Sequence, residues 1–209
     1  MKLCFLGRQG SDVMIVGLDV DGIIRDFNGS LKRVYLREYP DHKVTDPTEW
    51  DLSKAYPIGK DINKFAFETY VNEIYLEADP YEGALDFVED IARDYEIVII
   101  TSQPNYQAVY NSFEWLNKHG FNKYVSNHVF KDSSSKVFTK GHVRVDVLID
   151  DYEENLKDAW EMGVFAVGIE RSWNKGKWDP LFKNYHDLLQ FLKRYEKVKE
   201  GKIEIPNLS

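Results

Sequence analysis

The chain has 209 residues, of which 43% are hydrophobic and 14% aromatic, and 35 acidic side chains outnumber 27 basic ones for a net charge of −8. This length suits a single domain that carries a small insert, and this apolar content excludes an intrinsically disordered chain. Because a negatively charged surface repels other polyanions, we expect the protein not to bind polymeric nucleic acid.

The sequence has no segment that predicts membrane insertion or export. Its longest apolar runs have the length of strands, far below the roughly 18 residues that span a membrane, and the apolar patch near its start is too short for a signal peptide. The single cysteine, Cys4, cannot form a disulfide within the chain. We therefore expect a cytoplasmic protein that makes no contact with a membrane.

Apolar runs of strand length alternate along the chain with amphipathic segments of helical length. The runs lie at 14–19, 95–101, 124–130, 143–150 and 164–169, of which the third is the weakest. The helical segments present these apolar faces: Leu85, Val88 and Ile91; Val109, Phe113 and Leu116, with Trp115 left open; and Leu156, Ala159 and Trp160. This alternation is typical of a parallel sheet with helices on both faces.

The first connection is far longer than one crossover helix requires. Residues 28–80 precede the helix that leads into the second strand, and within them the segment 61–78 carries apolar residues at helical spacing. Those residues are Phe67, Tyr70, Val71, Ile74, Tyr75 and Ala78. Since unstructured loops of this length are uncommon in compact domains, we expect 28–80 to form a small helical cap on a core made of 14–27 and 81–195. Residues 196–209 are expected to form a loosely held C-terminal tail.

Carboxylates follow two of the predicted strands where each strand ends. Asp19 and Asp21 come after the first strand, and Asp150 and Asp151 come after the fourth. In a parallel sheet such positions meet at the carboxyl edge, and carboxylates crowded there repel one another unless a cation is present. Oxygen ligands without histidine or cysteine favour Mg²⁺. Either pair alone is equally well explained by helix caps and turns, but both pairs together favour a metal site.

Hydroxyl and ammonium groups are predicted near the same edge. Thr101 and Ser102 end the second strand, and their hydroxyls with exposed backbone N–H groups form the kind of nest that binds an anion. A helix N-cap explains this pair at least as well. Lys140 lies shortly before the last acidic strand and is a candidate to bind the same anion, and Lys136 is a second candidate. A lysine taken alone is typically a solvated surface group.

Taken in order, these segments resemble the motifs of the haloacid dehalogenase-like (HAD) phosphohydrolases. The resemblance spans about residues 15–169 and includes the position of a cap between the first and second motifs. It rests on four segments: Asp19-Val-Asp21-Gly, Thr101-Ser102, Lys140 and Leu148-Ile-Asp150-Asp151. It implies a phosphoric monoester hydrolase with an α/β fold, in which a parallel sheet of strand order 3-2-1-4-5 carries a small helical cap after its first strand.

Within that superfamily the sequence is similar to the 5′(3′)-deoxyribonucleotidases. The similar segments are 19–27, which ends in Phe27 as the family's first motif ends in phenylalanine, Glu82-Gly83-Ala84, and Thr101-Ser102-Gln103-Pro104. The family's lysine stands ten positions before the acidic pair, which selects Lys140 over Lys136 because 150 − 140 = 10. Two features depart from the family: Phe138-Thr139-Lys140-Gly141 replaces its Arg-Asp-Lys-Thr, and the cap aromatics align only approximately. Phosphatase chemistry is therefore better supported than base or sugar preference.

The resemblance also implies a role for each site residue. Asp19 would be the nucleophile that forms an aspartyl-phosphate, and Asp21 would be the general acid and base. Mg²⁺ would be held by Asp19, the backbone carbonyl of Asp21 and Asp151, with Asp150 beside them as support or ligand. The phosphoryl oxygens would be bound by Thr101, Ser102 and Lys140.

Three aromatic residues are candidates for stacking on a base: Phe27, Trp50 and Tyr70. The alternative for each is a place in the core of a small cap, and this alternative is weakest for Phe27 and strongest for Tyr70. The leading interpretation is a Mg²⁺-dependent nucleotidase that dephosphorylates nucleoside monophosphates. The competing interpretations are a HAD phosphatase for another small phosphate ester, such as a sugar phosphate, and a non-catalytic scaffold that binds a nucleotide or a protein partner. The sequence leaves open the base, the sugar, the position of the phosphate, and whether the protein forms a homodimer.

Overall fold

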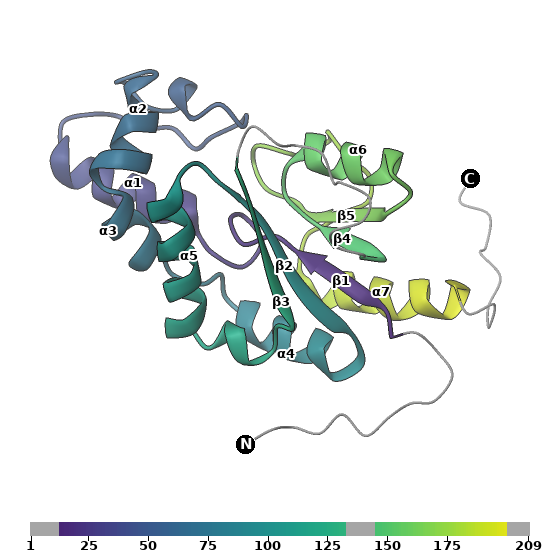
Figure 1. Ribbon diagram of the computed structural model, residues 1–209. Coiled ribbons are helices and arrows are strands. Elements are labelled where there is room, and N and C mark those ends of the chain that lie inside the picture. The colour runs from purple at the N-terminus through teal and green to yellow at the C-terminus, as the bar shows by residue number, and fades with distance from the viewer. Residues whose placement is uncertain (1–12, 133–144, 200–209) are drawn as a thin grey trace.

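The computed structural model describes residues 13–132 and 145–199 as an open sheet flanked by helices (Figure 1). The strands are β1 (Ile15–Leu18), β2 (Glu96–Gln103), β3 (Asn127–Asp132), β4 (Val147–Ile149), β5 (Phe165–Ile169) and β6 (Leu181–Phe182). They are ordered β3-β2-β1-β4-β5-β6, and each neighbouring pair is parallel. The predicted parallel sheet and the order of its first five strands are confirmed. The short strand β6 extends one edge, and no apolar run of strand length predicts it.

Helices cover both faces of the sheet. On one face α4 (Ala84–Asp94), α5 (Tyr106–Lys118) and α7 (Tyr185–Lys199) share a core with the inward side chains of the strands, among them Val16 and Leu18 of β1. On the other face α6 (Glu153–Glu161) packs through Leu156 and Ala159 against β4 and β5. A short 3-10 helix, η3 (Phe121–Lys123), joins α5 to β3.

The inward faces of α5 and α6 differ from the predicted ones. Phe113 and Trp160, which the apolar pattern places in the core, are 39% and 56% exposed, so both assignments are wrong. The buried residues of α5 instead include Asn111, Ser112 and Trp115. The reason is that α5 also packs against helices from the 28–80 segment, and polar side chains on that side bond to their backbone. Hydropathy alone does not mark such a face.

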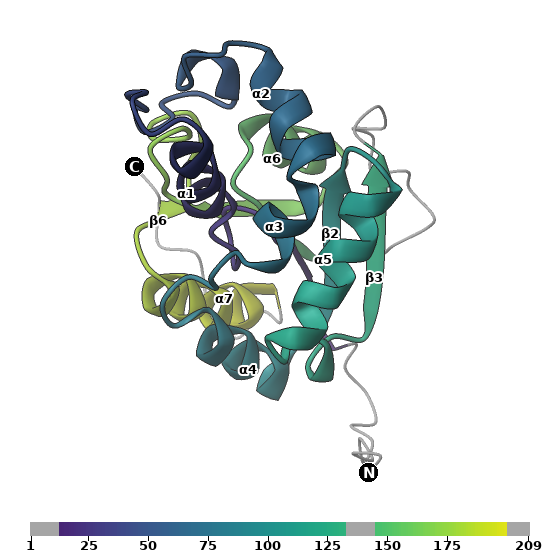
Figure 2. The ribbon, with the colours of Figure 1, turned by 90° about the vertical axis from the view of Figure 1, so that its left-hand side faces the viewer.

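Residues 28–80, which we call the insert, form a group of helices with an apolar core of its own. The helices are α1 (Phe27–Glu38), η1 (Leu52–Lys54), α2 (Asp61–Lys64), the π-helical turn η2 (Phe65–Thr69) and α3 (Val71–Leu76). The buried side chains of this core include Leu31, Tyr35, Ile62, Ile74 and Tyr75. Figure 2, which views the molecule from the insert's side, shows α1 and α3 in front of the sheet, with α4 and α7 below them.

The single helix predicted at 61–78 is wrong, because the π turn η2 interrupts it. A π turn adds a residue to one turn, and each added residue rotates the following side chains by about 100° around the axis. The members of the predicted stripe that follow the turn are buried: Val71, Ile74, Tyr75 and Ala78. At the turn itself Phe65 and Ala66 are buried instead, and Phe67 and Tyr70 are partly exposed.

Polar side chains of α5 hold the insert by its backbone. Asn111 Nδ2 donates to the carbonyl oxygen of Val71 at 3.2 Å, and Trp115 Nε1 donates to that of Ala78 at 2.7 Å. Both bonds are buried, so breaking either one leaves an unsatisfied polar group and costs about 1–3 kcal/mol. The insert is therefore fixed in position against α5.

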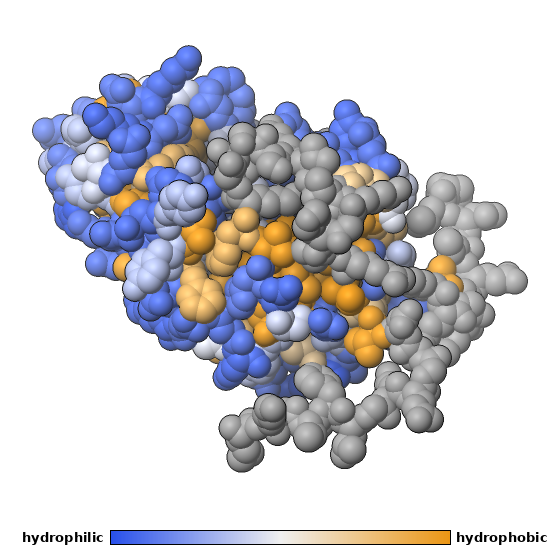
Figure 3. All heavy atoms as spheres, in the orientation of Figure 1, coloured by the Kyte–Doolittle hydropathy of each residue, from blue (hydrophilic) through white to orange (hydrophobic). Residues whose placement is uncertain are grey.

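Helix α7 continues to Lys199, so residues 196–199 of the predicted tail are helical, while 200–209 lie outside the described residues. Among the helices of the described ranges, none combines the length and the apolar character that a transmembrane helix needs. Figure 3 shows polar side chains over the outer surface of the insert, and apolar ones gathered in the middle of the view, where Figure 1 draws the strands.

Candidate active site

The carboxyl edge of the sheet brings three carboxylates together. Asp19 follows β1, and Asp150 and Asp151 follow β4, whose Ile149 lies opposite Leu18 in the parallel register. One oxygen atom of each carboxylate lies within 4.8 Å of the others. All three side chains are buried. We call these three residues the carboxylate group.

The carboxylate group is electrostatically crowded. Burial, followed by the charges of Asp150, Asp151 and Asp21, raises the pKa of Asp19 well above its ordinary value, and a hydrogen bond from Thr101 opposes the rise. The pKa of Asp151 is also raised, first by burial and then by the charge of Asp150, and a hydrogen bond from Trp173 opposes this rise. Such a site gains stability when a cation neutralises it.

The two neighbouring carboxylates at the end of β4 are held differently. Both oxygens of Asp150 accept hydrogen bonds, Oδ1 from the backbone N–H of Tyr152 at 2.9 Å and Oδ2 from Asn155 Nδ2 at 3.0 Å. Asp151 Oδ2 accepts from Trp173 Nε1 at 2.9 Å. Asp151 Oδ1 is buried and has no hydrogen-bond partner within the described ranges. Asp151 thus has one oxygen that is available to a metal ion, whereas both oxygens of Asp150 accept hydrogen bonds from the residues that follow it.

Gly22 lets the first turn approach Asp151 closely. Its φ of +72° lies in the left-handed region, and a Cβ atom built on it would lie 1.8 Å from Asp151 Oδ2. Only glycine fits both conditions. The Asp-x-Asp-Gly motif therefore needs glycine at its fourth position because the side chain of Asp151, from the second acidic pair, occupies the space beside it.

Asp21 lies apart from the carboxylate group and faces Arg25. Nε and Nη2 of Arg25 donate to its two carboxylate oxygens at 2.7 and 2.8 Å. Gln103 Nε2 approaches Asp21 Oδ2 at 3.3 Å and also donates to Thr101 Oγ1 at 3.0 Å. The second aspartate of the motif is thereby restrained at the side of the first.

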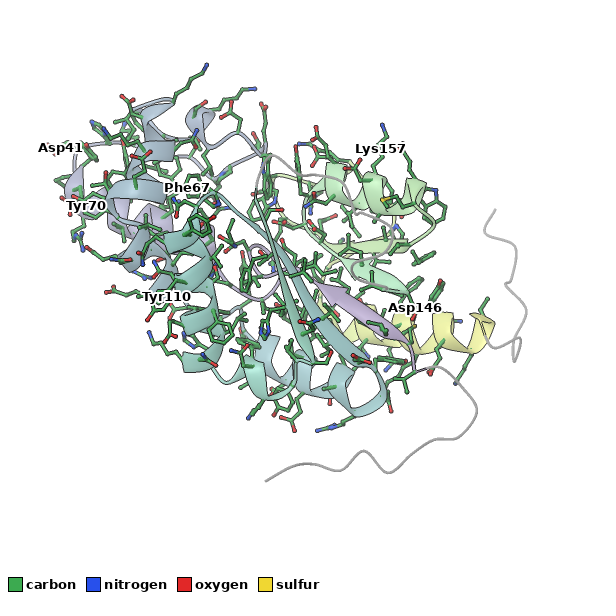
Figure 4. All side chains as sticks on the ribbon, viewed as in Figure 1. Asp41, Phe67, Tyr70, Tyr110, Asp146 and Lys157 are labelled. Atoms are coloured by element: carbon green, nitrogen blue, oxygen red, sulfur yellow. The ribbon has the colours of Figure 1, made fainter. Side chains whose placement is uncertain are left out.

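A cavity of about 540 Å³ opens over this edge of the sheet, between the core and the insert. Its lining includes the following predicted site residues: Asp19, Asp21, Phe27, Trp50, Thr101, Ser102 and Asp151. Tyr70 is not among the lining residues. Its ring packs on that of Phe65 at 4.5 Å, and Figure 4 shows it farther out on the insert than Phe67. Lys140, the predicted phosphate-binding lysine, and its competitor Lys136 lie outside the described residues.

Aromatic side chains line two sides of the cavity. Phe27 is stacked on Phe67 at a centroid distance of 5.8 Å and meets the edge of Tyr75 at 5.3 Å. Trp50, which is 46% exposed, stacks on Tyr152 at 4.3 Å. The second pair joins the insert to the core across the cavity.

Sequence reasoning missed several residues of the site. Trp173 and Asn174, which bond to the side chain and carbonyl of Asp151, follow the last long strand in a region without a motif. Phe67 and Tyr75 line the cavity although their pattern predicts only a core role. The role of Arg25 could have been predicted from the sequence, because a cation inside the apolar turn after β1 needs a nearby anion.

Comparison with known proteins identifies the family. The model of the family described as 5′ nucleotidase, deoxy (Pyrimidine), cytosolic type C protein matches residues 13–176, more than half of the chain. A Chlorobaculum tepidum protein named "Putative 5′(3′)-deoxyribonucleotidase" is 22% identical over 194 residues, which cover 87% of this chain and 91% of that protein.

Solved structures show the same fold. A haloacid dehalogenase-like family hydrolase from Streptococcus pneumoniae has a TM-score of 0.62 at 12% identity, over 86% of this chain and 98% of its own. The Bacillus subtilis protein YfnB, solved with bound magnesium, has a TM-score of 0.60 at 12% identity, over 87% of this chain and 99% of its own. These likenesses show the fold, and the family match shows the kind of enzyme. The chain belongs to the 5′ nucleotidase, deoxy (pyrimidine), cytosolic type C family and is a phosphatase with the HAD-like fold.

Proposed function

We propose that the protein is a cytoplasmic, Mg²⁺-dependent 5′(3′)-nucleotidase that dephosphorylates deoxyribo- or ribonucleoside monophosphates. One observation carries the proposal: the buried carboxylate group borders a cavity whose other walls are aromatic. An acidic metal site suits a phosphoryl group, and aromatic faces suit a base. The description of the family and the name of the Chlorobaculum tepidum relative support the same class of substrate.

The side chains present fit a magnesium ion. The group consists of carboxylate oxygens, the hard ligands that Mg²⁺ prefers, and Asp151 Oδ1 is a buried acceptor in need of a partner. We assign Asp19, Asp151 and the backbone carbonyl of Asp21 as ligands and Asp150 as their hydrogen-bonded support. Bound there, the ion would lower the repulsion between an attacking carboxylate and a phosphate dianion. The magnesium bound to YfnB, which shares this fold, supports the choice of ion.

The first half-reaction transfers the phosphoryl group to the enzyme. A carboxylate oxygen of Asp19 attacks phosphorus, and the bond from phosphorus to the sugar oxygen breaks. Protonated Asp21 gives its proton to that leaving oxygen, so the nucleoside departs as a neutral alcohol. The products are the nucleoside and an aspartyl-phosphate on Asp19.

The second half-reaction returns the enzyme to its starting state. Asp21, now a carboxylate, takes a proton from a water molecule as the water oxygen attacks phosphorus. The bond between phosphorus and Asp19 breaks, which releases inorganic phosphate and leaves Asp21 protonated again. Thr101, Ser102 and Lys140 are the groups that we assign to the phosphoryl oxygens, and Thr101 and Ser102 line the cavity beside Asp19.

The insert supplies the base-binding side of the site and acts as a cap. The cavity volume of about 540 Å³ lies within the range typical of small-molecule sites. Phe27 and Trp50 are the residues that we assign to the base, because both line this cavity from the insert's side. The contact between Trp50 and Tyr152 closes the cap over the bound nucleotide.

A phosphate-release screen tests the proposal. The panel contains 5′- and 3′-nucleoside monophosphates with deoxyribose and ribose, sugar phosphates and p-nitrophenyl phosphate, each with Mg²⁺ and with chelator. We expect the highest kcat/KM on a nucleoside monophosphate and loss of turnover with chelator. Faster turnover of sugar phosphates than of every nucleotide would contradict the substrate assignment, and full turnover with chelator would contradict the metal.

A further inference from the structure

Arg25 is a fully buried cation in the turn after β1, with 0% of its surface exposed. A charge in such a place is strongly destabilising unless it is paired. Its partner is Asp21, whose two carboxylate oxygens accept from Nε at 2.7 Å and from Nη2 at 2.8 Å. Two parallel bonds between a guanidinium and a carboxylate fix both the position and the plane of the carboxylate.

Three further side chains hold the guanidinium in place. Its central carbon lies 4.6 Å from the ring centre of Tyr75 and 5.3 Å from that of Trp115, and Nη2 also donates to Ser112 Oγ at 3.1 Å. Tyr75 belongs to α3 of the insert, whereas Ser112 and Trp115 belong to α5. Arg25 is thus seated at the contact that joins the insert to the core, and it can move only if this contact opens.

The pairing with Asp21 neutralises the buried guanidinium, and it also restrains a carboxylate of the site. Asp21 lines the cavity, and its side chain keeps 22% of its surface exposed. Without the arginine, this carboxylate would be free to rotate within a site that already holds three others. The fork and the bond from Gln103 Nε2 hold it at the cavity wall, outside the carboxylate group.

We propose that Arg25 is a positioning residue, which holds the Asp21 carboxyl where it can reach the oxygen of the leaving nucleoside. The inference rests on the proposed role of Asp21 as general acid and base. Arg25 itself transfers no proton and keeps its charge throughout. Asp21 gives a proton to the leaving oxygen in the first half-reaction and takes one from water in the second. The full fork belongs to the carboxylate state, and in the protonated state the oxygen that carries no proton still accepts from Arg25 and keeps the carboxyl at the same wall.

Substrates with different leaving groups test this inference. A nucleoside leaves as an alkoxide and needs the proton, whereas 2,4-dinitrophenolate leaves readily without one. For Arg25→Met we expect kcat/KM to fall about 100-fold on the nucleotide that the wild type prefers, the cost of misplacing a catalytic group by about 1 Å. On 2,4-dinitrophenyl phosphate we expect a loss of less than about 3-fold. Arg25→Lys should behave in the same way, since an ammonium keeps the charge but cannot form the fork.

Arg37→Met is the matched control. Arg37 also pairs with an acid, Glu73, and lies over an aromatic ring, that of Tyr70, but it is exposed and not among the residues that line the cavity. This variant should keep wild-type rates on both esters. Circular dichroism and thermal unfolding show whether each variant is folded. If Arg25→Met does not fold, the comparison of the two esters is made with Arg25→Lys.

Asp21→Asn separates failure of the inference from failure of the proposed function. For this variant we expect kcat/KM to fall about 10²- to 10⁴-fold on the nucleotide and far less on 2,4-dinitrophenyl phosphate. If Asp21→Asn discriminates between the esters and the folded Arg25 variants lose equally on both, Arg25 has only a structural role and the inference is wrong. If Asp21→Asn does not discriminate, Asp21 is not the general acid, and the inference falls with that assignment.

Discussion

The sheet wall and the insert wall of the cavity differ in charge, burial and attachment. On the sheet wall, Asp19 and Asp151 line the cavity and are 7% and 1% exposed. Asp150 beside them is 3% exposed and accepts hydrogen bonds on both of its oxygens. On the insert wall, Trp50 is 46% exposed and rests on one ring of the core. Groups that must keep one geometry through two half-reactions are rigidly held. Of the two groups assigned to the variable part of a substrate, Phe27 is buried in the core of the insert and Trp50 is held by its stack on Tyr152.

The comparison predicts that a change on the sheet wall affects all substrates alike. The largest effect is expected for Asp19→Asn, because an amide does not attack phosphorus. Its rate should fall below about one hundredth of wild type, which corresponds to roughly 2.7 kcal/mol of barrier, on nucleotide and p-nitrophenyl phosphate equally. Steady-state phosphate release measures this. The variant should remain folded by circular dichroism, since the change removes one of several crowded charges, and a higher residual rate would reject Asp19 as the nucleophile.

Asp151, on the sheet wall, and its neighbour Asp150 form a natural pair of variants. Asp151→Asn should raise the Mg²⁺ concentration for half-maximal activity by more than Asp150→Asn does, because Asp151 Oδ1 is uncommitted while both oxygens of Asp150 already accept hydrogen bonds. For Asp150→Asn, which changes the supporting residue, we expect the Mg²⁺ concentration for half-maximal activity to rise about 10- to 100-fold. Titration of activity with Mg²⁺ gives both values. The reverse order would make Asp150 the ligand and Asp151 its support.

On the insert wall, Phe27→Leu should affect nucleotides selectively. Leucine keeps most of the volume beside Phe67 and Tyr75 but removes the aromatic face. Stacking of a base on an aromatic ring is worth about 1–3 kcal/mol, so kcat/KM on a nucleotide should fall about 5- to 150-fold. The rate on p-nitrophenyl phosphate should stay near wild type. Equal losses on the two esters would mean that Phe27 only packs the insert.

The smallest effect is expected for Trp50→Ala. Its stack on Tyr152 is exposed to solvent, and an aromatic pair contributes about 0.5–1.5 kcal/mol, so KM for a nucleotide should rise about 2- to 12-fold with kcat nearly unchanged. Trp160→Ala, which removes an exposed indole that does not line the cavity, is the control and should change neither constant. A fall in kcat without a change in KM would show that Trp50 acts on chemistry rather than on closure.

The sheet wall was predictable because its signals are local. Each of the strands β1, β2 and β4 is an apolar run that ends in the residues that form the site, and parallel strands bring such ends together. The positions of Asp19, Asp150 and Asp151 therefore follow from the sequence. Strand β6 does not, because two residues, Leu181 and Phe182, carry no periodicity.

The insert wall was less predictable because its geometry depends on contacts between distant segments. The π turn at Phe65–Thr69 interrupts the predicted helix, and no residue type in that stretch marks it. Likewise, Asn111 and Ser112 are buried only because α5 meets the insert there. The pairing of Arg25 with Asp21 needs the folded turn, which places residues four positions apart side by side.

Trp173 gives the site an optical reporter of its own. Its indole is 7% exposed, and Nε1 donates to Asp151 Oδ2. This oxygen belongs to the same carboxylate as Oδ1, the atom that we assign to the metal. Indole emission responds to charge and hydrogen bonding at Nε1, so occupancy of the site changes the fluorescence of this tryptophan. Trp115 is fully buried and bonds to a backbone carbonyl of the insert, so its emission follows the seating of the insert. Two variants that each keep one of these tryptophans would thus record ion binding and the seating of the insert as separate signals, without any substrate.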